Sequence, residues 1–147
     1  MQLVKRILLV EDSLRDAELV IEALEEYHLA NSIVHLRDGA EALDYLHRRG
    51  PYANRENDLP AVVMLDLKMP KVDGLEVLQE MKKDPVLKVV PVVIMTSSRE
   101  ERDLYNSYRS GVNAYVVKPV KFHEFIDAVR QLGFFWAMLN EPPSECR

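Results

Sequence analysis

The chain has 147 residues, and its 48% hydrophobic and 29% charged composition is typical of one soluble globular domain. Its 24 acidic and 19 basic side chains leave a net charge of −5, which disfavours binding to nucleic acid or to an anionic membrane surface. The apolar run near the amino terminus is too short for a signal sequence or a membrane span, so we expect a cytoplasmic protein.

Five short apolar runs are each bounded by charged or turn-forming residues, a pattern typical of buried parallel strands. They cover Ile7–Val10, Ile33–Leu36, Ala61–Leu65, Val92–Met95 and Ala114–Val117. The segments between them have helical rather than alternating periodicity. The chain is therefore predicted to alternate strands and helices.

Five helices are predicted after these strands. The apolar stripe of the first is formed by Leu14, Ala17, Ile21 and Leu24. It follows Ser13, a favourable capping residue. A capping side chain three residues before an acid, at Asp38–Glu41 and Ser98–Glu101, predicts where the second and fourth helices begin. The third is predicted over Gly74–Lys83 and the fifth over Phe122–Leu132.

Five strand–helix units in 147 residues have about 29 residues each, close to the ~30 of a βαβ unit. The fold class is therefore α/β with a five-stranded parallel sheet. Right-handed crossovers make this sheet doubly wound, with functional groups beyond the carboxyl ends of its strands. The irregular segment His47–Pro60 is rich in turn-forming residues and is predicted to be a long, solvated connection.

Polar side chains follow four of the five runs, namely Glu11 and Asp12, then Asp66, Thr96 and Lys118. Three carboxylates brought together would repel one another unless they shared a cation. With Lys118 the cluster keeps two net negative charges, which matches one divalent ion, and hard oxygen ligands suit Mg²⁺. An aspartate beside a metal can act as a nucleophile toward a phosphoryl group. Lys118 and Thr96 would then stabilise the phosphoryl oxygens.

This constellation resembles the receiver domain of two-component response regulators. The resemblance spans roughly residues 4–132 and rests on Glu11-Asp12, Asp66-Leu67-Lys68-Met69-Pro70, Asp73-Gly74, Thr96-Ser97, Tyr115 and Lys118-Pro119. It implies a flavodoxin-like (βα)5 fold with strand order 2-1-3-4-5. The corresponding domains would be a receiver over residues 1–132 and a carboxyl-terminal extension over residues 133–147.

The resemblance also implies a function. Asp66 would accept a phosphoryl group from a phosphohistidine of a sensor histidine kinase. Asp12, Asp66 and the backbone carbonyl of Lys68 would bind Mg²⁺ directly, and Glu11 would bind it through water. The chain would be a phosphoacceptor signalling protein rather than an enzyme acting on separate substrates.

A conformational switch is a second implication of the resemblance. Thr96 would move toward the acyl phosphate and Tyr115 would turn inward, which would change the surface that other proteins contact. In this family the positions of Lys68 and Ser98 tune how fast the phosphoryl group is lost.

The carboxyl-terminal tail predicts a protein–protein contact. Its aromatic and apolar residues lack helical periodicity and include Phe134, Phe135, Trp136 and Met138. One helix face cannot bury all of them, so we expect a homodimer contact, with capping of the core as the alternative. The tail, together with His47–Pro60, resembles the small response regulators paired with cyanobacterial and bacterial phytochromes. The implied partner is a light-sensing histidine kinase.

Three alternatives share parts of this pattern. A flavodoxin-like cofactor binder would need a phosphate-binding loop where this chain has Glu11-Asp12. An aspartate-nucleophile phosphatase of the haloacid dehalogenase type would need Asp-x-Asp, whereas Asp66 is followed by Leu67-Lys68. The third is a docking module of the receiver fold that works without phosphorylation.

Overall fold

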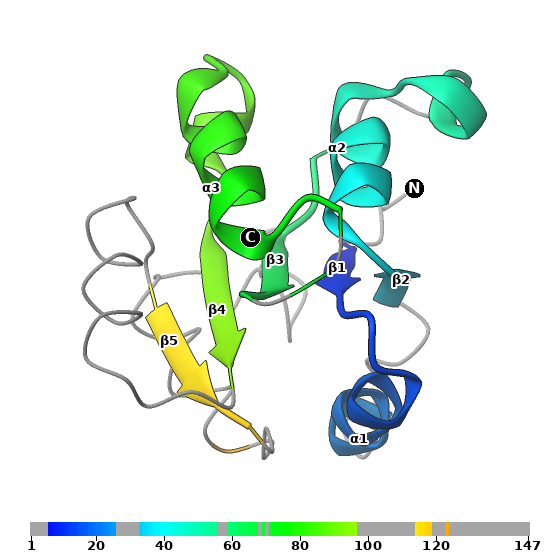
Figure 1. Ribbon diagram of the computed structural model, residues 1–147, viewed down its shortest axis with the longest axis vertical. Helices are drawn as coiled ribbons and strands as arrows, with labels where there is room; N and C mark the ends of the chain where they lie inside the picture. The colour runs from blue at the N-terminus through cyan, green and yellow to red at the C-terminus, as the bar shows by residue number, and fades with distance from the viewer. Residues whose placement is uncertain are drawn as a thin grey trace, which may run out of the picture.

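A computed structural model describes residues 6–25, 33–55, 59–67, 69, 71–96, 114–118 and 123. Within these ranges, five parallel strands form one sheet in the order β2-β1-β3-β4-β5 (Figure 1). They are β1 (Ile7–Val10), β2 (Ile33–Leu36), β3 (Val62–Asp66), β4 (Val92–Thr96) and β5 (Ala114–Val117). The predicted doubly wound sheet and its strand order are confirmed.

The third and fourth strands each extend one residue past the predicted ends. Asp66 still pairs with Met95, and Thr96 still pairs with Val117. Both polar residues are thus the last residues of their strands rather than the first residues after them. The sheet backbone therefore holds them more rigidly than a loop would.

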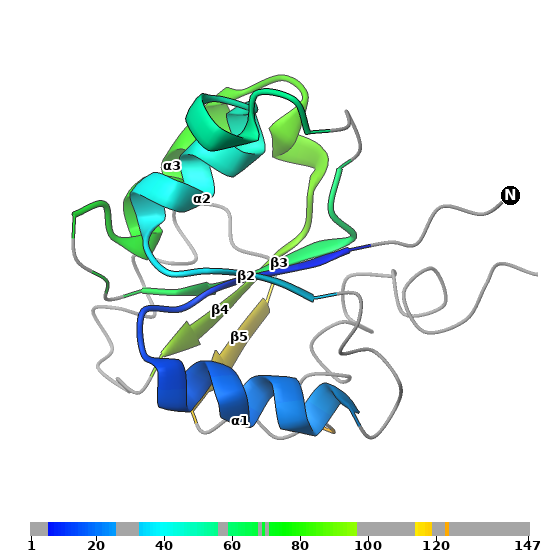
Figure 2. The same ribbon diagram turned by 90° about the vertical axis from the view of Figure 1, so that its right-hand side faces the viewer.

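Strand alternation divides the interior into two cores. Helix α1 (Leu14–Glu25) lies on one face of the sheet, and α2 (Gly39–His47) and α3 (Gly74–Lys83) lie on the other (Figure 2). Ile7 and Leu9 belong to the core under α1, whereas Leu8 and Val10 belong to the core under α2 and α3. Both faces of β1 are covered, as a continuous apolar run requires.

The first three predicted helices are present. Helix α3 has the predicted bounds, and Asp38 caps α2 by accepting a hydrogen bond from the Glu41 amide at 2.8 Å. Glu41 Oε1 accepts from the Arg37 amide rather than completing the predicted reciprocal bond with Asp38. The fourth predicted helix lies outside the described residues, and of the fifth only His123 is described, in a helical conformation. Among the described helices, none is long and apolar enough to cross a membrane.

The predicted stripe of α1 is wrong at its first position. Leu14 is 52% exposed, whereas Ala17, Val20 and Leu24 are buried. Leu14 is the first residue of the helix, which begins beyond the carboxyl edge of the sheet, so the sheet does not cover it.

The prediction of a solvated connection over His47–Pro60 is confirmed for most of its described residues, because residues 48–51, 53 and 54 are exposed. Part of this connection is nevertheless regular. A 3-10 turn, η2 (Gly50–Tyr52), follows α2. The ring of Tyr52 packs edge-on against Tyr45, with ring centroids 5.1 Å apart, and its hydroxyl donates to Glu41 Oε2 at 2.7 Å. The aromatic ring therefore folds this connection back onto α2. A second 3-10 turn, η3 (Leu87–Val89), precedes β4.

Candidate functional site

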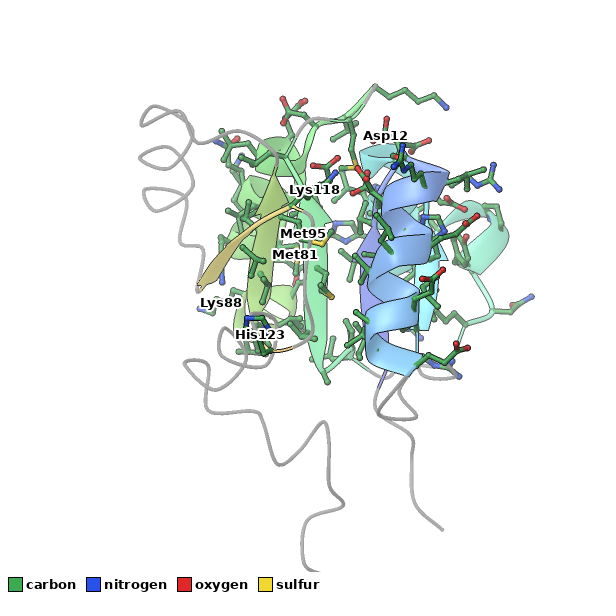
Figure 3. All side chains as sticks on the ribbon, turned by 90° about the horizontal axis from the view of Figure 1, so that it is seen from below. Asp12, Met81, Lys88, Met95, Lys118 and His123 are labelled. Atoms are coloured by element: carbon green, nitrogen blue, oxygen red, sulfur yellow. The ribbon has the colours of Figure 1, made fainter. Side chains whose placement is uncertain are left out.

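Three carboxylates meet at the carboxyl edge of the sheet. Glu11, Asp12 and Asp66 each offer an oxygen within 4.8 Å of the others'. Glu11 and Asp66 are buried, and Asp12 is exposed in the segment between β1 and α1. Asp12 and Lys118 lie at the same end of the sheet, opposite Lys88 (Figure 3). The strand ends thus place a mostly enclosed acidic cluster with one exposed side.

Lys118 enters this cluster from the end of β5. Its Nζ lies 2.6 Å from Glu11 Oε1, 3.0 Å from Asp16 Oδ2 and 3.4 Å from Asp66 Oδ2. Burial of the ammonium acts to lower its pKa, but the contacts with Glu11 and Asp16 and the charge of Asp66 together outweigh burial and raise the pKa of Lys118. The lysine is therefore charged over the whole physiological range.

Asp66 is under opposing electrostatic influences. Its burial and the neighbouring Glu11 charge raise the pKa of its carboxyl group above the ordinary value, and Lys118 lowers it in part. The single positive charge of Lys118 does not neutralise the negative charge of the carboxylates around it. The site therefore fits a further cation, and oxygen donors open to solvent on the Asp12 side suit a small, hard divalent ion.

Three hydrogen bonds hold Glu11 in place. Its amide donates to the Leu36 carbonyl at 3.0 Å, and its own carbonyl contacts His35 Nε2 at 2.8 Å. Its Oε2 accepts from the Ser13 amide at 3.1 Å. β2 thus holds the Glu11 backbone and the Ser13 amide, just before α1, orients the carboxylate, which leaves Oε1 for Lys118.

Helix α3 packs tightly against the backbone of Asp66. Asp73 and Glu76 form a reciprocal capping box at its start. The Gly74 amide donates to the Leu67 carbonyl at 2.9 Å, and a Cβ at Gly74 would lie 2.1 Å from the Asp66 carbonyl oxygen. The Asp73-Gly74 pair therefore sets how closely α3 approaches the site.

The structure brings together Glu11, Asp12, Asp66 and Lys118, four of the predicted site residues. For the two predicted switch residues it places the backbone, because Thr96 ends β4 and Tyr115 pairs with Ile94. The remaining predicted residues lie outside the described ranges; they are Lys68, Ser98, Phe134, Phe135, Trp136 and Met138.

Sequence reasoning missed Asp16. Its carboxylate contacts Lys118 at 3.0 Å, closer than that of Asp66. The signal was its place three residues after Ser13, at the start of the helix that follows the acidic pair. That pattern is typical of a capping box and gives no hint of a partner 102 positions away.

The fold and the acidic cluster are those of a known family. The response regulator receiver domain family matches residues 7–130, and this chain belongs to it. The structure of the bacteriophytochrome response regulator AtBRR is 59% identical, with a TM-score of 0.86, over 95% of this chain and all of that one. RtBRR, a second bacteriophytochrome response regulator, is 57% identical, with a TM-score of 0.84, over 96% of this chain and 85% of that one.

A cyanobacterial relative extends the comparison. Response regulator Rcp1 of Synechocystis sp. is 41% identical over 132 residues, which are 90% of this chain and 88% of that protein. A solved structure of Rcp1 is a Mn²⁺-bound form, with 38% identity and a TM-score of 0.74 over 94% of this chain and 96% of that one.

Proposed function

We propose that Asp66 is the phosphoacceptor of this receiver and that its donor is a phosphohistidine of a sensor histidine kinase. One observation carries this assignment: Asp66 is the buried carboxylate at the end of β3 that also has the Lys118 ammonium 3.4 Å from its Oδ2. An Asp66 oxygen attacks phosphorus and forms the P–O bond while the P–N bond breaks. The imidazole keeps the electron pair of that bond.

Lys118 and Thr96 are assigned to the transferred group. The charged lysine is positioned to neutralise a phosphoryl oxygen, because its Nζ already reaches the acceptor carboxylate. Thr96 ends the neighbouring strand and would donate a hydrogen bond to a second oxygen. Movement of Thr96, with Tyr115, would transmit the phosphorylated state to the protein-binding surface.

The metal is assigned as Mg²⁺. Asp12, Asp66 and the Lys68 backbone carbonyl would hold it directly and Glu11 through water, which is the all-oxygen, partly hydrated environment that Mg²⁺ favours. The Mn²⁺-bound form of Rcp1 supports a divalent ion of this kind. When bound, Mg²⁺ would neutralise charge on the phosphoryl group in transfer.

The partner is assigned as a phytochrome with histidine kinase activity, in the cytoplasm. The support is the 59% identity to AtBRR and the 41% identity to Rcp1. The receiver would occupy residues 1–132, and the extension 133–147 would form a homodimer through Phe134, Phe135, Trp136 and Met138. The only chemistry would be transfer to Asp66 and loss from it, with signalling through protein contacts and no nucleic acid or membrane partner.

Acetyl phosphate with Mg²⁺ tests the acceptor. Mass spectrometry of the intact native protein should show the gain of one phosphate, which hydroxylamine removes because it cleaves an acyl phosphate. The gain should disappear without Mg²⁺ and in Asp66→Asn. The matched control is Asp44→Asn, since Asp44 lies on α2 and pairs with Arg49 away from the site; this variant should be labelled like the native protein.

Other outcomes support the alternatives. Labelling of Asp66→Asn to the native extent would show that another residue is the acceptor. An unlabelled native protein that still binds a kinase would favour the phosphorylation-independent docking module. Rapid turnover of phosphate esters would favour the phosphatase, and binding of FMN would favour the cofactor binder.

A further inference from the structure

Asp16 is a fourth carboxylate at the site, supplied by the first turn of α1. Its Oδ2 accepts a hydrogen bond from Lys118 Nζ at 3.0 Å. The ammonium has three N–H groups and faces three carboxylates, those of Glu11, Asp16 and Asp66. Within the described residues, the Lys118 ammonium therefore already lies among three carboxylates before any phosphoryl group arrives, and it donates a hydrogen bond to Asp16.

The direction of the Asp16 side chain has a local cause. After Ser13, an acid at this position commonly turns back to the Ser13 amide and completes a capping box. Here Glu11 Oε2 already accepts from that amide at 3.1 Å. Asp16 keeps half of the motif, because its own amide donates to Ser13 Oγ at 3.2 Å, and its carboxylate is left to reach Lys118.

The three partners of Lys118 differ in how easily they can release it. The side chains of Glu11 and Asp66 are 0% and 7% exposed, so neither could be solvated by water if the ammonium left. The Asp16 side chain is 36% exposed. Water can replace the lysine at Asp16, which makes this contact the one that breaks when a phosphoryl oxygen needs an N–H donor.

We propose that Asp16 is a positioning residue that holds Lys118 in the unphosphorylated protein and competes with the phosphoryl group on Asp66 for it. The inference rests on the proposed function of Asp66. Asp16 thereby slows accumulation of the phosphorylated form, because Lys118 must release the Asp16 carboxylate before it can donate a hydrogen bond to the transferred phosphoryl group. The contact between Asp16 and Lys118 lowers the rate of phosphorylation, and Asp16 itself does not bind the phosphoryl group.

The test compares Asp16→Asn with the native protein at subsaturating acetyl phosphate and saturating Mg²⁺. Asparagine keeps the shape of the side chain and removes its charge. A partly exposed ion pair contributes about 0.2–1 kcal/mol, so the initial rate of phosphorylation should rise by up to about fivefold. The matched control is Glu18→Gln, which removes the same charge from an exposed position on the same helix and should leave the rate unchanged.

A second background separates competition for Lys118 from simple repulsion of the anionic donor. In Lys118→Gln, the added Asp16→Asn change should have no effect, because the lysine for which Asp16 competes is gone. A rise of the same size there would overturn the inference and assign the effect to charge alone. Thermal unfolding of each variant checks that the helix start is intact.

Carbon-13 labelling of lysine gives a readout that needs no phosphorylation. The Cε resonance of Lys118 should shift in Asp16→Asn and stay in place in Glu18→Gln. An unshifted resonance, or equal rates of labelling for Asp16→Asn and the native protein, would overturn the role of Asp16 while the acceptor assignment stands. A native protein that is not labelled at all would overturn the proposed function and this inference together.

Discussion

Glu11 and Asp66 are buried side chains whose charges are costly to remove from water, and Lys118 offsets that cost. The geometry depends on close backbone packing as much as on charge. Gly74 allows α3 to approach the Asp66 carbonyl more closely than any residue with a Cβ would. At the scale of single residues, the site is thus defined by one glycine as well as by its ionisable groups.

Gly74→Ala should displace Asp66. The new Cβ would lie 2.1 Å from the Asp66 carbonyl oxygen, so α3 or the end of β3 must shift. We expect the free energy of unfolding to fall by about 1–3 kcal/mol, and the rate of labelling by acetyl phosphate to fall as well. Urea denaturation and the labelling rate measure the two effects.

Gly50→Ala is the control for that substitution. Gly50 has φ of +57°, and a Cβ there would lie no closer than 3.8 Å to Asp44 Oδ2. The left-handed backbone alone should cost about 1–2 kcal/mol without changing the labelling rate. Equal loss of labelling in both variants would contradict a specific role for the close approach of α3.

Helix α2 and the turn η2 form one packed element. Tyr45 and Tyr52 meet edge to face, and the Arg55 guanidinium carbon lies 4.2 Å from the centroid of the Tyr45 ring. The Arg55 Nε also donates to the Tyr45 carbonyl at 3.0 Å. Aromatic and cation–π contacts therefore hold the chain after α2 against the helix, although most of its described residues are exposed as composition predicts.

The stability of this element should fall at alkaline pH. Burial and then the hydrogen bond to Glu41 raise the pKa of Tyr52 from 10.0 to about 12. Because the folded pKa is above the unfolded one, the contribution of Tyr52 to stability is complete below pH 10.0 and is lost as the pH rises to about 12. Absorbance titration of the native protein against Tyr52→Phe measures this ionisation.

Glu41→Gln is the matched variant, since it keeps a hydrogen-bond acceptor and removes the charge. The pKa of Tyr52 should fall toward its ordinary value in this variant. Tyr52→Phe should lower the free energy of unfolding at neutral pH by about 1 kcal/mol. A tyrosine titration unchanged by Glu41→Gln would show that the carboxylate does not hold the Tyr52 hydroxyl.

At the scale of the whole molecule, one sheet separates two cores and carries the site at its carboxyl edge. Side chains of β1 alternate between the core under α1 and the core under α2 and α3. Glu11 directly follows this strand and contacts Lys118, which directly follows β5. Packing on both faces therefore fixes the strand ends, and the strand ends fix the site.

Removal of residues 134–147 should convert the proposed homodimer to a monomer. The tail holds Phe134, Phe135, Trp136 and Met138 within a short stretch, and aromatic anchors of this kind stabilise protein interfaces. Analytical ultracentrifugation of the full chain and of the truncated chain gives their masses in solution, and circular dichroism checks that the truncated chain folds. An unchanged mass after truncation, or a monomeric full chain, would contradict the dimer contact.

The sequence by itself determined the five strands, the three described helices and most of the acidic cluster. Short apolar runs marked the strands, the capping pattern at Asp38 marked the start of α2, and the ends of the runs located Glu11, Asp12, Asp66 and Lys118. These features follow from local periodicity and residue type, and parallel strands bring their carboxyl ends to one edge. Local sequence patterns were therefore enough to predict these strands, this helix start and these site residues.

Only the tertiary structure decided the contacts between distant segments. The contact between Asp16 and Lys118 joins residues 102 positions apart. The Asp16 side chain is free to make it because the Ser13 amide already donates to Glu11. The exposure of Leu14 likewise depends on where α1 begins relative to the sheet. Such contacts depend on how helices and strands pack and on which hydrogen-bond donors already have an acceptor. The spacing of residues along the chain predicts neither.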